Sequence, residues 1–177
     1  MAGDTFTPET IRFVCATREN RETFLQRTAL GRSLSVYKYP FVELRLFESN
    51  TTALPVVYNR AIDEAIERPA ILVFIHDDVL MCDYFWPEHI VGALQEFEVV
   101  GLAGNRRRVA NQPSWVYVND QLTPDAPEYL SGVIGHGKHF PPDILSIYGA
   151  PCQEVKLLDG LMLACRSRVL HETTNTA

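Results

Sequence analysis

Buried strands are predicted at intervals along the first part of the chain. The runs 11-IRFVCAT-17 and 70-AILVFIH-76 are apolar without alternation, which is typical of strands covered on both faces. The segment 42-VELRLFES-49 alternates apolar and polar residues and predicts another strand. A fourth strand is predicted at 98–104, where apolar residues are followed by glycine.

Helices are predicted in the intervals between these strands. Residues 20–30 are expected to form a helix with Asn20 as its N-cap and Gly31 as its stop signal. Apolar residues recur at the i, i+3, i+4 and i+7 positions of 54–69, which indicates an amphipathic helix. A third helix is expected at 87–97, beginning with a proline. The resulting order, βαβαβαβ, predicts an α/β fold with a mostly parallel sheet flanked by helices.

The remainder of the chain has a different character. Residues 105–150 are rich in Pro, Gly, Asn and Asp, and we expect a long irregular region with one short hairpin around 114–119. Regular structure is expected to return at 153–167, as two short strands that flank Asp159 and Gly160.

The length, charge and cysteine content of the chain limit the classes of protein to which it can belong. A chain of 177 residues suits a single domain. With a net charge of −6 and one basic cluster, Arg106–Arg108, general nucleic-acid binding is not expected. The four cysteines form no CxxC pair, the N-terminus lacks a hydrophobic signal region, and no apolar run reaches the ~20 residues of a membrane span. We therefore expect a cytoplasmic protein without a transmembrane segment.

The candidate chemistry lies at the end of the third strand, where His76 is followed by Asp77 and Asp78. Ligands of open parallel sheets bind at the carboxyl ends of the strands. Successive side chains of a strand point to opposite faces, so both carboxylates can serve one ligand only if the chain turns here. We assign a divalent metal ion to Asp78 and a ligand hydroxyl to Asp77. The alternative is that the pair caps the following turn.

Several phosphate-binding signatures are missing. Neither GxGxxG nor GxxxxGK[ST] is present, so the sequence carries neither the dinucleotide-binding fingerprint nor the P-loop fingerprint. Receiver domains place paired acids after the first strand, but here that strand leads into 15-CATR-18. A nucleotidyltransferase would combine a similar sheet with acids and a metal, yet it normally needs a Gly-rich phosphate loop near the N-terminus.

Three segments together resemble a known family. The runs 54-LPVVYNRAI-62, 74-FIHDDV-79 and 159-DGLMLACRSRVL-170 are similar to the GT-A glycosyltransferases of the large inverting family 2. The resemblance is nearest to the subgroup of streptomycin-biosynthesis-type glycosyltransferase domains and covers roughly residues 10–170. It implies a GT-A fold, a nucleotide-diphospho-sugar donor and a Mn²⁺ or Mg²⁺ ion, with the Asp77–Asp78 pair in the part of the family's DxD-type motif.

The resemblance also implies roles for other residues. The exit of the first strand, 16–18, would line the nucleotide, and Glu48 would contact the base. Tyr58 and Asn59 match a YN pair that supports the nucleotide pocket. Independently of the resemblance, the charge of Arg106–Arg108, just after the fourth strand, would stabilise the diphosphate, or the three arginines form a solvated surface run. The nucleotide-sugar residues predicted in this way are Thr17, Arg18, Glu48, Asn59, Asp77, Asp78 and Arg106.

The expected catalytic base is where the chain departs from the family. Family members carry this carboxylate in an acidic motif beyond the DG segment, whereas here the sequence continues only to 171-HETTNTA-177. We expect a shortened form, a base role for Asp159, or a module that binds the donor without transferring sugar. The expected function is inverting transfer to an unknown acceptor, and the alternative is non-catalytic nucleotide-sugar binding.

For the other candidate site residues, a structural role explains the sequence at least as well as a functional one. His76 precedes the acid pair, and a histidine at a strand end is more often structural than a ligand. His136, His139 and Asp143 form a loose group in a Gly- and Pro-rich segment without regular metal-ligand spacing. Trp115, in the irregular region, would either meet an acceptor or pack in the short hairpin.

Overall fold

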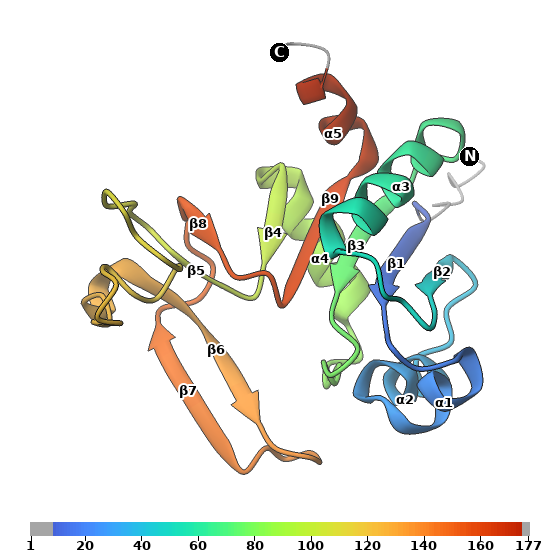
Figure 1. Ribbon diagram of the computed structural model, residues 1–177, viewed down its shortest axis with the longest axis horizontal. Helices are drawn as coiled ribbons and strands as arrows, with labels where there is room; N and C mark the ends of the chain where they lie inside the picture. The colour runs from blue at the N-terminus through green and yellow to red at the C-terminus, as the bar shows by residue number, and fades with distance from the viewer. Residues whose placement is uncertain (1–8, 175–177) are drawn as a thin grey trace, which may run out of the picture. The chain divides into compact units, whose positions relative to one another are not determined.

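The computed structural model describes the backbone of residues 9–174 and the side chains of residues 9–171. The protein is α/β, with a mixed sheet of five strands and several helices, and it divides into two compact units (Figure 1). The first unit consists of Met1–Val99 and Ala164–Ala177, and the second of Val100–Leu163. Among the described residues, no helix has the length and apolar content that crossing a membrane requires.

The larger sheet has the strand order β2-β1-β3-β9-β4. Its strands are β1 (Ile11–Ala16), β2 (Val42–Phe47), β3 (Ile71–Ile75), β9 (Met162–Arg166) and β4 (Val99–Gly101). Strand β1 pairs in parallel with both β2 and β3, and all five residues of β3 are buried. The strands predicted at 11–17, 42–49 and 70–76 are therefore confirmed, and continuous apolar character does correspond to burial on both faces.

Two predicted helices are confirmed with close bounds. Helix α3 (Leu54–Glu67) carries a proline in its first turn and buries Val57, Ala61 and Ala65, which lie four residues apart. Helix α4 (Trp86–Glu96) likewise has Pro87 in its first turn. A proline there removes an N–H that has no partner within the helix, so it helps to fix where each helix begins.

The prediction of one helix ending at Gly31 is wrong, because Thr28 divides the segment into two helices and the second continues beyond Gly31. Asn20 does cap α1 (Arg21–Arg27), accepting a hydrogen bond from the Thr23 amide. Thr28 then adopts an extended conformation and caps a second helix, α2 (Ala29–Val36). Gly31 lies inside α2, and a Cβ atom there would come within 2.0 Å of the Phe24 carbonyl oxygen. The glycine therefore permits close packing of the two helices rather than ending one of them.

The strand predicted at 98–104 is divided. Residues Val99–Gly101 form β4 of the larger sheet, whereas Ala103–Asn105 form β5 of a second sheet. Leu102 separates them and is 42% exposed. A continuous apolar run in the sequence does not reveal that the strand changes sheets.

The second unit contains a four-stranded sheet of order β7-β6-β5-β8. The expectation of an irregular region over 105–150 is wrong from residue 130 onward, where β6 (Leu130–His136) and β7 (Ile144–Gly149) form an antiparallel hairpin after the short helix η1 (Pro127–Tyr129). Gly132 adopts φ 110° at an irregularity in this pairing. Glycines and prolines lower strand propensity, and the hairpin is stabilised by pairing that local sequence does not show.

The other predictions for the second half have mixed outcomes. Residues 114–119 form no hairpin of regular strands, and their part of the chain has an isolated antiparallel bridge between Tyr117 and Pro124. The two strands expected around Asp159 are confirmed as β8 (Leu157–Leu158) and β9. Helix α5 (Ser167–Thr174) was not predicted.

Candidate functional site

Thr17 joins the carboxyl ends of three neighbouring strands. It follows β1 directly, its amide donates to the Phe47 carbonyl at the end of β2 (3.0 Å), and its hydroxyl donates to Asp77 Oδ2 beyond the end of β3 (2.6 Å). Since β1 lies between β2 and β3, the last contact spans the point where the strand order reverses. Ligands of open α/β sheets bind in the crevice at such a switch point.

The acid pair lies in a turn, as the alternation of side chains along a strand requires. Asp77 and Asp78 follow β3 as turn residues, and the Val79 amide donates to the His76 carbonyl at 3.4 Å. The Asp77 carbonyl accepts a hydrogen bond from the Leu30 amide of α2 (3.1 Å). The main chain is thereby held while the two side chains point independently of strand geometry.

The carboxylates of Asp77 and Asp78 differ in burial and in their hydrogen-bond partners. Asp77 is half-buried and one of its oxygens is bound by Thr17, whereas Asp78 is exposed. Within the part of the chain that the structure describes, no hydrogen bond or ion pair engages the Asp78 carboxylate, and neither side chain caps the turn that follows. This arrangement leaves Asp78 with its oxygens available to a cation.

A buried thiol lies beneath this edge of the sheet. Burial, followed by the charges of Asp77 and Asp78, raises the pKa of Cys15 to about 12. The thiol therefore stays protonated and acts as a small core residue.

Glu48, expected to contact a nucleotide base, has a structural partner. Its Oε2 accepts from the Arg21 amide at 2.8 Å, and its Oε1 lies 3.9 Å from Arg21 Nε. Arg21 begins α1, so the carboxylate satisfies one of the amides that a helix N-terminus leaves unpaired. Glu48 is nevertheless exposed and follows β2 at the same edge as Thr17.

The remaining first-unit candidates are not brought into contact with the acid pair. Arg18 is exposed beside Thr17, and Asn59 is exposed on α3. Among the described residues, no hydrogen bond or ion pair joins either of them to Asp77 or Asp78. Tyr58 packs on Phe74 of β3, with ring centroids 4.7 Å apart, and burial raises its pKa. Tyr58 therefore supports the strand that carries the acids.

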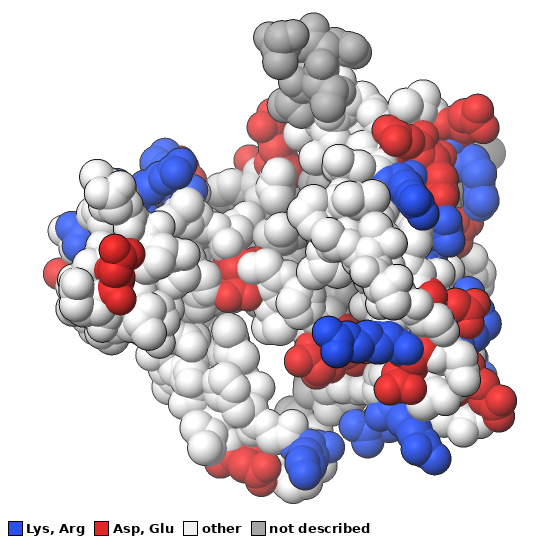
Figure 2. Space-filling model, viewed as in Figure 1, with Lys and Arg blue, Asp and Glu red and all other residues white. Residues whose placement is uncertain are grey.

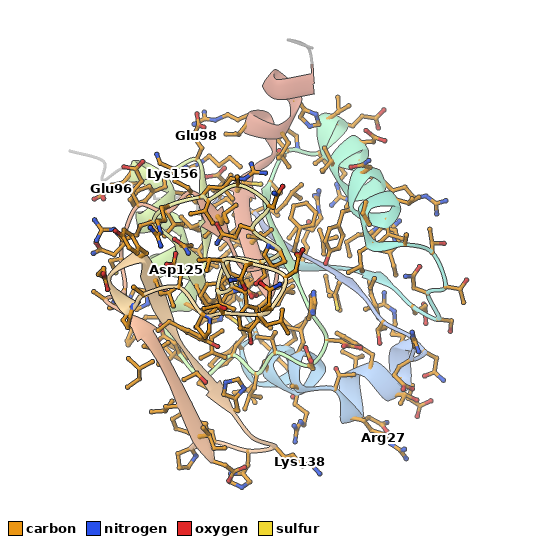
Figure 3. All side chains as sticks on the ribbon, turned by 60° about the vertical axis from the view of Figure 1, so that its left-hand side comes forward. Arg27, Glu96, Glu98, Asp125, Lys138 and Lys156 are labelled. Carbon is orange, nitrogen blue, oxygen red and sulfur yellow. The ribbon has the colours of Figure 1, made fainter. Side chains whose placement is uncertain are left out.

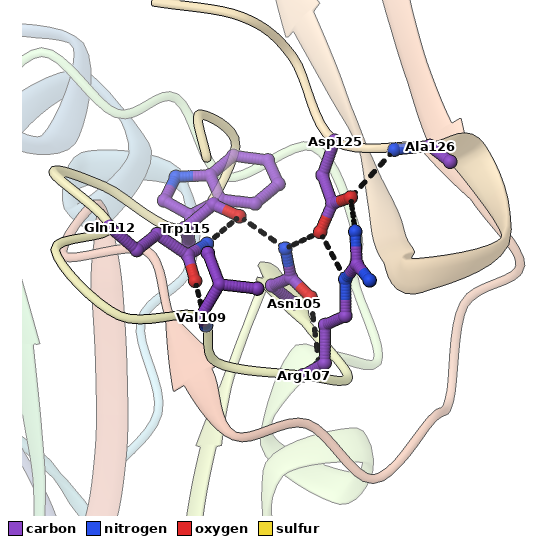
Figure 4. A network of polar contacts seen from close by, with 7 residues as sticks. All are labelled: Asn105, Arg107, Val109, Gln112, Trp115, Asp125 and Ala126. Carbon is purple, nitrogen blue, oxygen red and sulfur yellow. Dashed lines mark hydrogen bonds and ion pairs between the residues drawn. The ribbon is translucent and has the colours of Figure 1, made fainter. Parts of the chain in front are cut away.

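The Arg106–Arg108 cluster is not a uniform solvated run. Arg107 forms two hydrogen bonds with the Asp125 carboxylate, at 3.0 Å and 2.5 Å (Figure 4). It also stacks over the Tyr129 ring at 3.7 Å. The Asn105 amide also donates to Asp125 (2.9 Å), and Figure 3 shows Asp125 surrounded by other side chains. Arg107 holds the pKa of Asp125 at about 2. Only Arg106 and Arg108 are exposed.

Asp159 is held in place by two donors. The Trp115 indole Nε1 donates to one carboxylate oxygen, and the Leu161 amide donates to the other at 2.6 Å. Trp115 packs against Tyr148 with ring centroids 4.7 Å apart, and its carbonyl accepts from Asn105. This places Asp159 at the end of the network that includes Asp125. Asp159 belongs to the second unit, as does Arg106.

Sequence reasoning missed this network. Asp125 is the buried acceptor that organises it, yet a single aspartate in a Pro-rich segment has no recognisable signature. The partners Asn105 and Arg107 lie 20 and 18 positions away, a distance that no local pattern spans. The one available signal was the group of arginines, because a buried carboxylate requires a cationic partner and these side chains can supply one.

A charged pocket of about 350 Å³ in the first unit is a less suitable binding site. Glu43 pairs with Arg12 and Arg68, each at 3.0 Å, and Arg45 pairs with Glu64 at 2.6 Å, lowering the pKa of Glu64. Since five of its six charged lining residues already form ion pairs with one another, this pocket has a structural explanation.

The described residues contain no group of three or more His, Cys, Asp and Glu side chains that could hold a metal ion by themselves. His136 is bound to Ser146 at 2.9 Å, while His139 lies 3.4 Å from Asp143. On the face drawn in Figure 2, acidic and basic side chains are interspersed over α1 and α3, without a broad field of one sign.

Comparison with known proteins gives no relative for the chain: no family model matches it, and no curated protein matches it.

Proposed function

We propose that the chain is a GT-A type glycosyltransferase that binds a nucleotide-diphospho-sugar and a divalent metal ion at the Asp77–Asp78 edge. The proposed reaction is transfer of the sugar to an acceptor hydroxyl with inversion. The observation that carries the proposal is the hydrogen bond between Thr17 and Asp77 at the switch point, beside the unengaged Asp78 carboxylate.

The donor set fits Mn²⁺ or Mg²⁺. Both ions prefer oxygen ligands, and Mg²⁺ is commonly bound by one or two carboxylates together with substrate phosphates rather than by an all-protein cage. Asp78 offers an exposed carboxylate, and Asp77 keeps one oxygen that Thr17 does not bind. A single protein carboxylate, that of Asp78, suits an ion that arrives with a diphosphate, and the free oxygen of Asp77 remains available to a ligand hydroxyl.

The chain's own groups support donor binding in specific ways. Thr17 orients Asp77, whose second oxygen is then directed for a ligand hydroxyl, while Asp78 holds the cation. When bound, the metal would stabilise the negative charge that develops on the leaving nucleoside diphosphate. Arg18 and Glu48, at the ends of β1 and β2, are the proposed contacts to the nucleotide, and Asn59 would support its pocket. Arg106 would add positive charge.

Transfer requires a base that accepts the proton of the acceptor hydroxyl. Asp159 is the proposed base, and its orientation by Trp115 and Leu161 is suited to a role that needs a defined geometry. Because both of its oxygens already accept a hydrogen bond, donor binding without transfer is the second candidate function.

Calorimetry tests donor binding directly. We expect UDP, GDP or dTDP to bind more tightly with Mn²⁺ than without it, and Asp78→Asn to abolish that difference. Asp63→Asn, which removes the same charge from an exposed position on α3, is the matched control and should leave it unchanged. Metal-independent binding, or no binding of any of the three, would refute the site.

A second measurement separates the two candidate functions. Each nucleotide-sugar whose diphosphate binds is incubated with the protein, and hydrolysis or transfer is followed by NMR, which also reports the anomeric configuration of the product. Turnover with inversion that is lost in Asp159→Asn supports the transferase. Metal-dependent binding without turnover supports the binding module.

A further inference from the structure

A β-bulge in the second unit takes one side chain out of regular strand pairing. In the hairpin of β6 and β7, Val133 pairs with Ile147. The preceding residue of β6, Gly132, pairs with Gly149, so Tyr148 has no residue opposite it. An extra residue of this kind bends its strand and re-aims a side chain, and bulges are frequent next to functional sites. The direction of the Tyr148 ring is therefore set by the bulge rather than by the alternation of β7.

The Tyr148 ring packs against Trp115. Their ring centroids are 4.7 Å apart with an interplanar angle of 71°, so the edge of one ring meets the face of the other. In this geometry the ring that presents its edge keeps both of its own faces uncovered by its partner. Both residues are partly exposed, and together Trp115 and Tyr148 form an aromatic corner in the second unit.

The main chain of Trp115 is anchored from the interior of the unit. Its carbonyl accepts a hydrogen bond from Asn105 Nδ2 at 2.8 Å, and the same amide donates to the buried Asp125 carboxylate at 2.9 Å (Figure 4). Arg107 donates to that carboxylate in turn. The bulge thus places one ring of the aromatic corner and the buried network holds the other, so both are in position before any ligand arrives.

A carboxylate lies directly beside the aromatic corner. The Trp115 indole donates to one oxygen of Asp159, whose other oxygen accepts from the Leu161 amide at 2.6 Å. A carboxylate has about four acceptor sites, so Asp159 can still accept a hydrogen bond from a ligand hydroxyl. A Cβ atom added to the exposed Gly160 would meet no atom of the described residues within 4 Å, which indicates open space next to the carboxylate.

We propose that the aromatic corner and Asp159 form the acceptor subsite, and that the acceptor is a saccharide. A pyranose ring presents a face of C–H groups, which fits an aromatic ring, and hydroxyl groups at its edge, which fit a carboxylate. Since two N–H donors already compensate the charge of Asp159, the site favours a neutral polyhydroxyl ligand over a cation. The inference rests on the proposed function, in which Asp159 accepts the proton of the acceptor hydroxyl.

The indole of Trp115 joins the two parts of this subsite. Because its N–H contacts Asp159 directly, a pyranose that stacks in the aromatic corner brings its edge hydroxyls toward the carboxylate. A flexible linear polyol carries the same hydroxyl groups but no rigid C–H face, so it gains little from the rings. The subsite therefore distinguishes cyclic from linear polyols.

NMR correlation spectra of the indole N–H groups test the subsite in the absence of any nucleotide. The two signals, from Trp115 and Trp86, are assigned with Trp86→Phe. We expect a methyl glycoside of glucose, galactose, mannose or N-acetylglucosamine to shift the Trp115 signal saturably and to leave that of Trp86, in the first unit, in place. D-Glucitol should shift neither signal. If none of these glycosides shifted Trp115, or if glucitol or tetramethylammonium shifted it as strongly, the proposal would be overturned.

Two variants locate the binding on the aromatic corner. Tyr148→Leu keeps an apolar side chain but removes the ring, and it should weaken the affinity for the glycoside about tenfold. Phe140→Leu, at a 66% exposed aromatic position in the connection of the same hairpin, is the matched control and should leave the affinity unchanged. The wild-type titration stands whether or not Tyr148→Leu folds. Equal affinities of folded Tyr148→Leu and Phe140→Leu would exclude the aromatic corner.

Failure of this inference can be told apart from failure of the proposed function. Metal-dependent binding of nucleoside diphosphate is measured through Asp78, and it does not involve the aromatic corner. If that binding is found and no glycoside shifts Trp115, the donor site stands and the acceptor subsite is wrong. If glycosides shift Trp115 and no nucleotide binds, the saccharide site stands and the glycosyltransferase proposal fails.

Discussion

Replacement of Asp125 by asparagine should destabilise the second unit. The Asp125 carboxylate accepts four hydrogen bonds: one from Asn105 Nδ2, two from the Arg107 guanidinium and one from the Ala126 amide, at 2.5–3.0 Å. An asparagine side chain retains one acceptor oxygen and presents an NH₂ group where donors already point. The substitution therefore removes the charge and leaves at least one donor without an acceptor.

The size of the effect follows from these contacts. A hydrogen bond to a charged group contributes ~1.5–3 kcal/mol to stability. The Asp125 side chain is 2% exposed, so water does not replace its bonds, whereas that of Arg107 is 40% exposed and regains hydration in part. We expect a loss of roughly 2–4 kcal/mol, which is a large share of the ~5–15 kcal/mol that stabilises a typical domain.

Tryptophan fluorescence can follow this loss because each unit contains one of the two tryptophans. In a Trp86→Phe background, Trp115 is the only tryptophan, and its main-chain carbonyl accepts a hydrogen bond from Asn105 within the same network. Urea denaturation of this background with and without Asp125→Asn gives the difference in free energy of unfolding. Amide hydrogen exchange should show that protection is lost mainly over β5 and β6.

Asp120→Asn is the matched control, since Asp120 is an exposed carboxylate of the same unit. It should change the free energy of unfolding by less than about 0.5 kcal/mol. If Asp125→Asn were as neutral as this control, or if it lowered protection equally in β1 and β3, the buried carboxylate would not organise the second unit and the reasoning would be refuted.

Three further predictions concern single positions. Gly31→Ala should destabilise the first unit by ~1–3 kcal/mol in urea denaturation, because the clash with the Phe24 carbonyl outweighs the better helix propensity of alanine. Thr17→Val should weaken Mn²⁺-dependent binding of nucleoside diphosphate about tenfold by calorimetry, because Asp77 loses a charge-assisted hydrogen bond. Since Arg107 holds the pKa of Asp125 at about 2, below the ordinary value of about 3.9, the stability difference between wild type and Asp125→Asn should be constant above pH ~5 and shrink toward pH ~2 in acid unfolding.

Sequence analysis correctly predicted the elements whose buried residues follow a regular local pattern. Strands β1 and β3 are continuous apolar runs, and the four-residue spacing of α3 matches its buried face. The turn at Asp77 and Asp78 followed from the alternation of side chains along a strand, without any need to know the neighbouring strands. Such features depend on the chain's own periodicity, which is visible in one dimension.

Features that depend on a distant partner were missed or misread. Gly31 looks like a stop signal because glycine commonly ends helices, but here it accommodates the Phe24 carbonyl. Strands β6 and β7 look like loops because of their glycines and the prolines between them, and only pairing across the hairpin makes them strands. In each case tertiary contact decides a local choice that propensity leaves open.

The candidate site likewise contains one contact that the sequence could predict and one that it could not. That the exit of β1 and the end of β3 approach each other follows from parallel strands sharing an edge, and Thr17 and Asp77 do meet. The contact between Trp115 and Asp159 spans 44 positions and joins an irregular segment to a strand end. No periodicity relates the two residues, so only the folded chain reveals the pair.

The distribution of the four cysteines has a practical consequence. Burial raises the pKa of Cys15 to about 12 and that of Cys165 to about 11, so neither thiol reacts with a maleimide near neutral pH. Cys82 in the first unit and Cys152 in the second are exposed. The unmodified chain thus offers one exposed thiol in each unit, so a single maleimide dye reports on each unit separately once the other exposed cysteine is replaced by serine.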